Sequence, residues 1–303
     1  EPALREWVAQ RVSQLGLPCS AQQVLILNGS QQGIDLMAKL LVEEGDRILV
    51  ESPAYLAALQ VFRLFGADMH GVAQDDDGAL PDALAAAPDA RLAYFTPTFQ
   101  NPTGRLLAED RRYQLAKRAR ELDLLILEDD PYGALSYDGE TPPSIRSLAP
   151  ERTVYMGSFS KVLAPGLRLG YIVAPAALRA KLVQAKQATD LHTATLSQMA
   201  VYDVVKDGFL DSHIPTIRAL YREQCAAMLA ALAQYMPEGV RWNKPRGGMF
   251  LWVELPKGLN ASAVLAKAVE QNVAFVPGAP FFAQNPDTAC FRMSFATSNL
   301  QKI

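Results

Sequence analysis

The chain has 303 residues, of which 50% are hydrophobic and 20% charged, so it can bury a large core and form roughly two domains. Its net charge of -3 offers no general attraction for a phosphate backbone, which argues against nucleic-acid binding by this chain. Cys19, Cys225 and Cys290 lie far apart and predict neither disulfides nor a metal site, as is typical of the reducing cytoplasm. The sequence contains no apolar run long enough for a membrane span.

Up to Pro175, short apolar segments alternate with amphipathic helical segments. Several of the apolar segments lack polar residues almost throughout, as expected of strands covered on both faces. This alternation predicts an α/β fold with a mostly parallel, seven-stranded sheet sandwiched by helices. The acidic run Asp75–Gly78 is predicted to be a solvated loop. The predicted strands are Val24–Leu27, Arg47–Val50, Asp68–Val72, Leu92–Phe95, Leu124–Leu127, Val154–Met156 and Tyr171–Ala174, and the helices include Gln31–Leu41, Tyr55–Phe65 and Ala108–Leu122.

After Pro175 the pattern changes to long helices that extend to about Tyr235. We expect the boundary between a large domain (1–200) and a small domain (201–303) to fall within these helices. The remaining segments predict a smaller C-terminal α+β domain. They are the amphipathic run Ile217–Tyr235, a helix at Ala261–Gln271, and strands at Met249–Glu254, Val273–Val276 and Cys290–Phe295.

The segment Gly157–Gly170 contains one lysine among two hydroxyl groups and one arginine. Lys161 follows Ser158 and Ser160, and Arg168 lies seven residues further on. A lysine beside serines suits a site that binds a phosphate and forms an imine with a carbonyl, two groups that pyridoxal 5′-phosphate combines. A guanidinium can bind two phosphate oxygens at once. By itself, the segment leaves a solvated surface lysine as the alternative.

Three more polar motifs adjoin predicted strands, at the edge where ligands gather in open α/β sheets. Glu128–Tyr132 follows one strand and Asn101–Gly104 follows another. Gly29–Gly33 lies between a strand and a helix, where backbone amides can bind a phosphate. The alternatives are an acidic loop or helix cap, an Asn-Pro turn, and a helix capped by the Ser30 side chain.

Arg292 lies within an otherwise apolar predicted strand. A buried cation is costly unless it is paired, so this position favours a ligand-binding role over a structural one. The chain lacks the glycine patterns of dinucleotide and nucleoside-triphosphate sites, so these ligands lose support.

These segments, in this order, resemble those of fold-type I, class I/II aminotransferases, and the likeness extends over essentially the whole chain. The Gly-Ser-Phe-Ser-Lys motif ending at Lys161 looks most like the kynurenine/2-aminoadipate aminotransferase branch, as does the Glu-Asp-Asp-Pro-Tyr-Gly motif from Glu128. The resemblance implies a pyridoxal 5′-phosphate enzyme that moves an amino group from an L-amino acid to a 2-oxo acid through a Schiff base on Lys161. It also implies a homodimer.

The resemblance assigns each motif to one part of the cofactor or substrate. Asp129 is expected to pair with the ring nitrogen, and Tyr55 is expected to stack on the ring. Tyr132 and Asn101 are expected to donate to the ring's 3′-oxygen. The residues expected to bind the phosphate are Ser30, Gln31, Ser158, Ser160 and Arg168.

Two further roles concern the substrate. Arg292 and Asn101 are expected to bind the substrate, with Arg292 taking the α-carboxylate of the amino acid. Lys161 is expected to carry a proton to and from the α-carbon, which requires a neutral amine and therefore a pKa well below that of free lysine.

Two other functions stay open. The chain could be the ligand-sensing domain of a winged-helix transcription regulator, whose DNA-binding segment would lie upstream, or a cofactor-dependent carbon–sulfur lyase. The sequence Pro131–Gly133, which follows Asp130, favours an enzyme. Family members extend beyond both Glu1 and Ile303, so the resemblance implies that this chain lacks the family's terminal segments.

Overall fold

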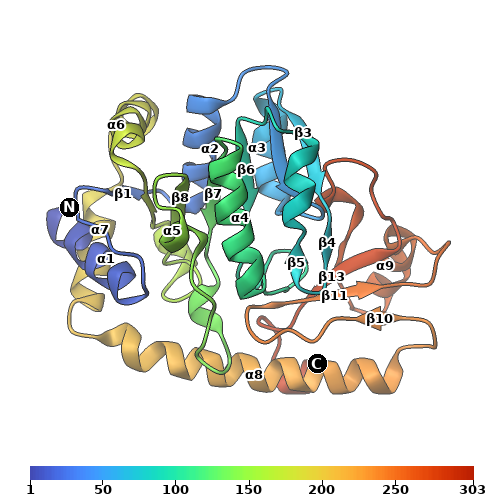
Figure 1. Cartoon of the computed structure of the whole chain (residues 1–303). Coiled ribbons are helices and arrows are strands. Elements are labelled where there is room, and N and C mark those ends of the chain that lie inside the picture. The colour runs from blue at the N-terminus through green and yellow to red at the C-terminus, as the bar shows by residue number, and fades with distance from the viewer.

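A computed structural model describes residues 1–303, except for the side chain of Lys302. A seven-stranded sheet forms its centre, in the order β1-β9-β8-β7-β6-β2-β3 (Figure 1). Only β9 runs against its neighbours, because it pairs antiparallel with both β1 and β8 while the other pairs are parallel. The strands are β1 Val24–Leu27, β2 Arg47–Glu51, β3 Asp68–Val72, β6 Leu92–Phe95, β7 Leu125–Asp129, β8 Thr153–Ser158 and β9 Gly170–Val173.

Helices cover both faces of this sheet. On one face α2, α3 and α6 pack over the centre, and on the other face lie α4 and α5. Helix α1 packs against β1 and α7 at one end (Figure 1). The helices are α1 Pro2–Gln14, α2 Ser30–Leu41, α3 Leu56–Leu64, α4 Glu109–Glu121, α5 Ile145–Leu148, α6 Ala176–Asp190, α7 Thr195–Val205, α8 Phe209–Tyr235 and α9 Ala261–Glu270.

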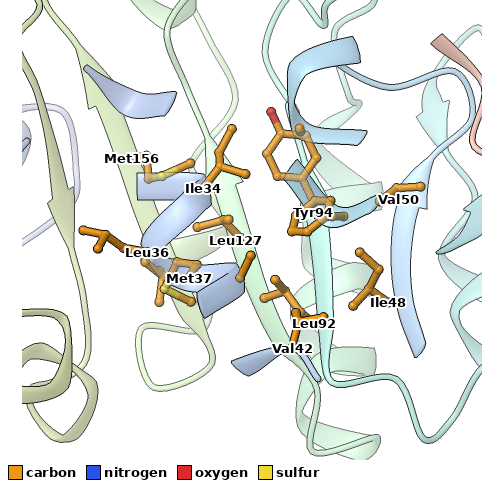
Figure 2. Packing of buried hydrophobic residues seen from close by; sticks show 14 of the residues in the cluster. Ile34, Leu36, Met37, Val42, Ile48, Val50, Leu92, Tyr94, Leu127 and Met156 are labelled. Carbon is orange, nitrogen blue, oxygen red and sulfur yellow. The ribbon is translucent and has the colours of Figure 1, made fainter. Parts of the chain in front are cut away.

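Side chains alternate between the two faces along each central strand, as the pleat of a strand requires. In β6, Leu92 and Tyr94 join the cluster under α2 and α3, whereas Ala93 and Phe95 join the cluster under α4. Leu127 of β7 lies in the first of these clusters, which Figure 2 shows with Tyr94 among its labelled members. Alternation therefore sets which polar side chains at the strand ends share one face.

A second, four-stranded antiparallel sheet with the order β10-β11-β13-β12 forms the C-terminal part of the chain. Helix α8 extends along the base of the molecule from the region of α7 to this sheet (Figure 1). The domain boundary expected near residue 200 precedes α8 and stays a prediction. The strands are β10 Arg241–Trp242, β11 Phe250–Glu254, β12 Val276–Pro277 and β13 Cys290–Ser294.

Two local predictions were wrong. The strand expected at Val273–Val276 is reduced to β12, because the chain is still leaving the turn at Asn272, whose φ is 61°. The loop expected at Asp75–Gly78 is instead a tight hairpin of β4 (Gln74–Asp75) and β5 (Gly78–Ala79). Arg111 of α4 donates to Asp75 and anchors this hairpin.

The strand ends converge at one edge of the seven-stranded sheet. Parallel strands β2, β6, β7 and β8 all finish there, and the chain continues from β1 into α2 at the same edge. Since β9 is antiparallel, its first residues lie at this edge as well. The polar motifs of the sequence are thereby gathered in one region, as expected for open α/β sheets.

Arg112 of α4 ties together the loops at this edge, although it is only 1% exposed. Its guanidinium donates to the carbonyl oxygens of Leu107 (3.0 Å), Pro97 (2.9 Å) and Pro143 (3.2 Å), and to the Thr98 hydroxyl (3.0 Å). The Arg112 guanidinium therefore donates hydrogen bonds to several buried oxygens that water does not reach.

We expect Arg112→Met to lower the free energy of unfolding by about 3 kcal/mol, because buried carbonyl oxygens lose their donor. Urea unfolding followed by circular dichroism measures the loss. Arg118→Met on the same helix is the control, since Arg118 makes only surface ion pairs and its removal should cost at most about 0.5 kcal/mol. Equal losses in the two variants would contradict this role of Arg112.

Candidate active site

A cavity of about 260 Å³ lies at the carboxyl edge of the large sheet. It brings together all the site residues predicted from the sequence, although they come from distant parts of the chain. They are Ser30, Gln31, Tyr55, Asn101, Asp129, Tyr132, Ser158, Ser160, Lys161, Arg168 and Arg292.

At one end of the cavity the start of α2 meets the segment that leads into β9. The N-cap of α2 is Gly29 and makes no side-chain capping bond, so the alternative of a helix capped by Ser30 is wrong. A Cβ on Gly29 would lie 2.7 Å from Nη2 of Arg168, and one on Gly170 would lie 2.7 Å from the amide nitrogen of Ser30. These two glycines let the arginine and the helix start approach each other closely.

Lys161 follows β8 in a turn that also contains two serines. The Ser158 hydroxyl accepts a hydrogen bond from the amide of Ser160 at 3.1 Å. Burial, followed by the nearby charges of Arg292 and Arg168, lowers the pKa of the Lys161 amine. A lowered pKa enlarges the fraction of neutral amine near pH 7, as a proton-transferring lysine requires.

The three acids at the end of β7 have different surroundings. Glu128 accepts hydrogen bonds from the first amides of α5, those of Ile145 (3.1 Å) and Arg146 (2.8 Å), so it caps that helix. Asp130 accepts from the Tyr155 hydroxyl at 2.9 Å and lines a different cavity. Only Asp129 lines the cavity that contains Lys161.

Burial raises the pKa of Asp129 to about 7, although the hydroxyl of Tyr94 donates to its Oδ2 at 2.8 Å. Its other oxygen, Oδ1, is buried and has no hydrogen-bond partner among the residues described. A buried acceptor without a partner is costly, so Oδ1 suits a bound group that carries an N–H or O–H donor.

Asn101 connects two other residues that line the cavity. Nη1 of Arg292 donates to its Oδ1 at 2.6 Å, and its Nδ2 donates to the Tyr132 hydroxyl at 3.3 Å. Arg292 lies over the ring of Phe250, with 4.3 Å between the guanidinium carbon and the ring centroid. The arginine within β13 is thus held by an amide and an aromatic face, and no carboxylate lies within ion-pair distance among the described residues.

Sequence reasoning missed Thr96, Pro131 and Phe250, which also line the cavity. Pro131 lies within the Glu128–Tyr132 motif. Phe250 opens an apolar strand and carries no signal that separates it from a core residue. A larger cleft of about 890 Å³ lies between β10 and the β4–β5 hairpin, and some of its charged residues pair with one another, as Arg241 does with Glu254. No cluster of residues suited to a metal ion occurs among the described residues, and none of their helices is long and apolar enough to span a bilayer.

A family model described as "Aminotransferase class I and II" matches residues 1–303. The 2-aminoadipate transaminase of Thermus thermophilus is 43% identical over 98% of this chain and 74% of its own length. Aromatic-amino-acid aminotransferase 1 of Thermococcus litoralis is 41% identical over 99% of this chain and 74% of its own length. The crystal structure of an alpha-aminoadipate aminotransferase of Thermus thermophilus, complexed with N-(5′-phosphopyridoxyl)-L-leucine, has a TM-score of 0.95 at 42% identity and covers 100% of this chain and 78% of that one.

The chain belongs to the class I and II aminotransferases, and it is a pyridoxal 5′-phosphate-dependent enzyme. The predicted fold type I is confirmed by the match to that crystal structure. These matches favour an aminotransferase over the regulator domain and the carbon–sulfur lyase that the sequence left open.

The cavity fits this cofactor chemically. Oδ1 of Asp129 is the buried acceptor that a protonated ring nitrogen needs, and Lys161 is an amine of lowered pKa for the aldehyde. The start of α2, close to Arg168, offers amides and a guanidinium to a phosphate.

We expect the purified protein to be yellow and to retain the cofactor covalently after borohydride treatment, with the added mass on the peptide that contains Lys161. In Lys161→Ala the fixed adduct should be absent, because no amine remains to bond the aldehyde. Lys181→Ala, which changes an exposed lysine of α6, should retain it. Mass spectrometry of the digested protein distinguishes these outcomes, and an unchanged adduct in Lys161→Ala would refute the assignment.

Proposed function

We propose that this aminotransferase takes its amino group from L-amino acids with long acidic or aromatic side chains, and passes it to a 2-oxo acid at Lys161. One observation carries the proposal: a single cavity unites the Lys161 amine, the unpartnered Asp129 oxygen and the Arg292 guanidinium. These are the groups needed for an amine, a cationic ring and a carboxylate.

Two sets of residues would hold the cofactor. Its phosphate would lie at the start of α2, bound by Ser30, Gln31, Ser158, Ser160 and Arg168. The side chain of Gln31 donates to the carbonyl oxygen of Ala57 at 3.2 Å, so we assign its backbone amide to the phosphate.

Tyr55 would stack on the ring, and Asp129 would pair with the ring nitrogen. Tyr55 opens α3 beside the cavity and is partly buried, which suits stacking on a planar ring. Asn101 and Tyr132 would donate to the ring's 3′-oxygen, a role that their mutual hydrogen bond supports by fixing both side chains.

Pyridoxal 5′-phosphate, when bound, supplies an aldehyde for the substrate amine and a ring that withdraws electrons from the α-carbon. Lys161, as a neutral amine, can take the proton from that α-carbon. Arg292 would bind the α-carboxylate through a forked pair of hydrogen bonds, with Asn101 keeping the guanidinium in position.

The relatives support the substrate class. Their names specify 2-aminoadipate and aromatic amino acids, and another solved structure, 38% identical with a TM-score of 0.95, is a kynurenine aminotransferase from Pyrococcus horikoshii. Phe250 and Tyr132 line the cavity and offer apolar surface to such long side chains.

We also propose that the protein forms a homodimer and is located in the cytoplasm. Leu191, Leu196 and Met199, at and after the corner between α6 and α7, are 73%, 80% and 55% exposed, which supports a contact with a second copy. The cysteines are free, as is usual in a reducing compartment.

A screen of amino donors against 2-oxoglutarate and pyruvate tests the proposed function. We expect kcat/KM for 2-aminoadipate, kynurenine and phenylalanine to exceed that for alanine by about tenfold or more, because longer side chains bury more surface. Without an acceptor, oxo acid should form only up to one equivalent per active site, because the amino group then stays on the enzyme. Release of ammonia and oxo acid from a sulfur amino acid without an acceptor would instead identify a carbon–sulfur lyase.

Arg292→Ala should raise the KM for amino acids and for oxo acids alike by about a hundredfold, since both half-reactions lose the same charge-assisted pair. Steady-state kinetics with each substrate varied in turn measures the change. Arg241→Ala, on the exposed strand β10, is the control and should leave both constants unchanged. An effect on only one of the two substrates would show that Arg292 does not bind the α-carboxylate.

A further inference from the structure

The hydroxyl of Tyr94 is a buried polar group that the proposed reaction does not use. Tyr94 lies in the middle of the sheet on β6, is 0% exposed, and packs its ring edge-on against Phe62 at 5.9 Å between centroids. Figure 2 shows the oxygen at the end of the ring that points away from Leu92 and Val42. The ring belongs to the hydrophobic core, and the hydroxyl extends from that core toward the strand ends.

The register of the sheet brings this hydroxyl to Asp129. Tyr94 is paired with Leu127, and Asp129 lies two residues further along β7, so its side chain emerges on the same face. The hydroxyl donates to Oδ2 at 2.8 Å, while Thr96 Oγ1 is 3.4 Å from the same hydroxyl. One carboxylate oxygen is thereby occupied.

The bond from Tyr94 also restricts the other carboxylate oxygen of Asp129. Oδ1 of Asp129 is buried without a partner among the described residues, and Asp129 lines the cavity that contains Lys161. A carboxylate with one oxygen fixed cannot rotate freely about its terminal bond without breaking that hydrogen bond. Its free lone pairs are thus presented to the cavity before any ligand arrives, which is preorganisation.

We propose that Tyr94 is a positioning residue, whose hydroxyl holds Oδ2 of Asp129 so that Oδ1 is aimed at the ring nitrogen of the cofactor. The proposal rests on the proposed function, in which Asp129 is the partner of that nitrogen. It adds a residue that touches neither substrate nor cofactor and acts through Asp129 alone.

The hydrogen bond also has an electrostatic consequence. Burial raises the pKa of Asp129, the Tyr94 bond opposes this rise, and the neighbouring Asp130 adds to it. The other titratable groups that line the cavity are Tyr55 before α3, Tyr132 after β7, Lys161 after β8, Arg168 before β9 and Arg292 on β13.

The raised pKa of Asp129 makes its charge depend on pH near neutrality. A raised pKa means that the carboxylate is present above that pKa and is lost as the pH falls through about 7. Removal of the Tyr94 donor raises the pKa further, so the charge that binds a cationic ring is lost at a higher pH.

The adjacent acid provides a matched control. Tyr155 of β8 donates to Oδ2 of Asp130 at 2.9 Å. It is 3% exposed, so it is nearly as buried as Tyr94. Tyr155→Phe removes an equivalent hydroxyl from the neighbouring carboxylate, which does not line this cavity.

The test measures the dissociation constant of pyridoxamine 5′-phosphate by the change in protein fluorescence, between about pH 5.5 and about pH 9, a range that spans the titration of a carboxyl with a raised pKa. This probe carries the same ring and phosphate but no aldehyde, so it cannot bond to Lys161. In Tyr94→Phe we expect binding to weaken roughly tenfold at pH 7 and its acidic midpoint to rise by about one pH unit. Tyr155→Phe should neither weaken binding nor raise the midpoint, since the loss of its hydroxyl favours a neutral Asp130, which no longer raises the pKa of Asp129.

Asp129→Asn separates the proposal from the function on which it rests. We expect this variant to bind weakly without the acidic midpoint, and Tyr94→Phe to add nothing in its background. If Asp129→Asn removes the midpoint but Tyr94→Phe leaves it unchanged, Tyr94 does not position the carboxylate and the proposed function stands. If Asp129→Asn changes nothing, Asp129 is not the partner of the ring nitrogen, and both fail.

A second substitution covers the case in which Tyr94→Phe does not fold. Fluorotyrosine at position 94 keeps the ring in the core and is a more acidic phenol, hence a stronger donor to Oδ2. It should move the acidic midpoint to lower pH, opposite to the shift in Tyr94→Phe. A midpoint that does not move would overturn the proposal.

Discussion

The alternation of side chains along β7 is the constraint on which the active site depends. Three acids follow one another at its end, and consecutive side chains of a strand must point to opposite faces. Glu128 therefore caps α5 on one face, whereas Asp129 enters the cavity on the other. Asp130, beyond the strand, turns back and accepts from the amide of Gly133 at 2.9 Å. A shift of one residue in this register would exchange the helix cap with the group that faces the cavity.

The position of Arg168 at the same edge of the sheet depends on β9, the one antiparallel strand. If β9 were parallel to β8, its first residue would lie at the far edge of the sheet, and Arg168 with it. Because β9 runs the other way, Gly170 pairs with Ser158 and stands against the start of α2. Arg168 has a φ of 51°, a left-handed conformation that is uncommon for residues with a side chain. This residue follows the short 3-10 helix Pro165–Leu167, and a left-handed residue is a common way for a helical turn to end.

Much of this architecture could be predicted from the sequence, because strands buried on both faces are nearly continuous apolar runs. The bounds of β1, β3 and β6 agree with the predicted ones, and every predicted site residue lines the one cavity. The failures concern contacts that a local pattern does not contain. The β4–β5 hairpin depends on Arg111, more than thirty positions away from Asp75.

The role of Tyr94 escaped prediction for a similar reason. In sequence it is one aromatic residue in a buried strand, and nothing nearby signals that its hydroxyl meets a carboxylate. The pairing register of β6 with β7, which sequence periodicity does not give, decides the contact. Likewise, the sequence alone does not show that the adjacent Asp129 and Asp130 line different cavities.

The charges in the cavity link substrate binding to proton transfer in the proposed reaction. Burial lowers the pKa of Lys161 most, and the charges of Arg292 and Arg168 lower it further while these cations have no counter-charge. An anion on either arginine offsets its charge and raises the pKa of the amine again. A substrate α-carboxylate on Arg292 would therefore make Lys161 a stronger base at the time when the α-proton has to be removed. A substrate amine that lacks a carboxylate would not bind to Arg292 and would not raise the basicity of Lys161. Arg292 would therefore favour amino acids in two ways, by binding their carboxylate and by making Lys161 a stronger base.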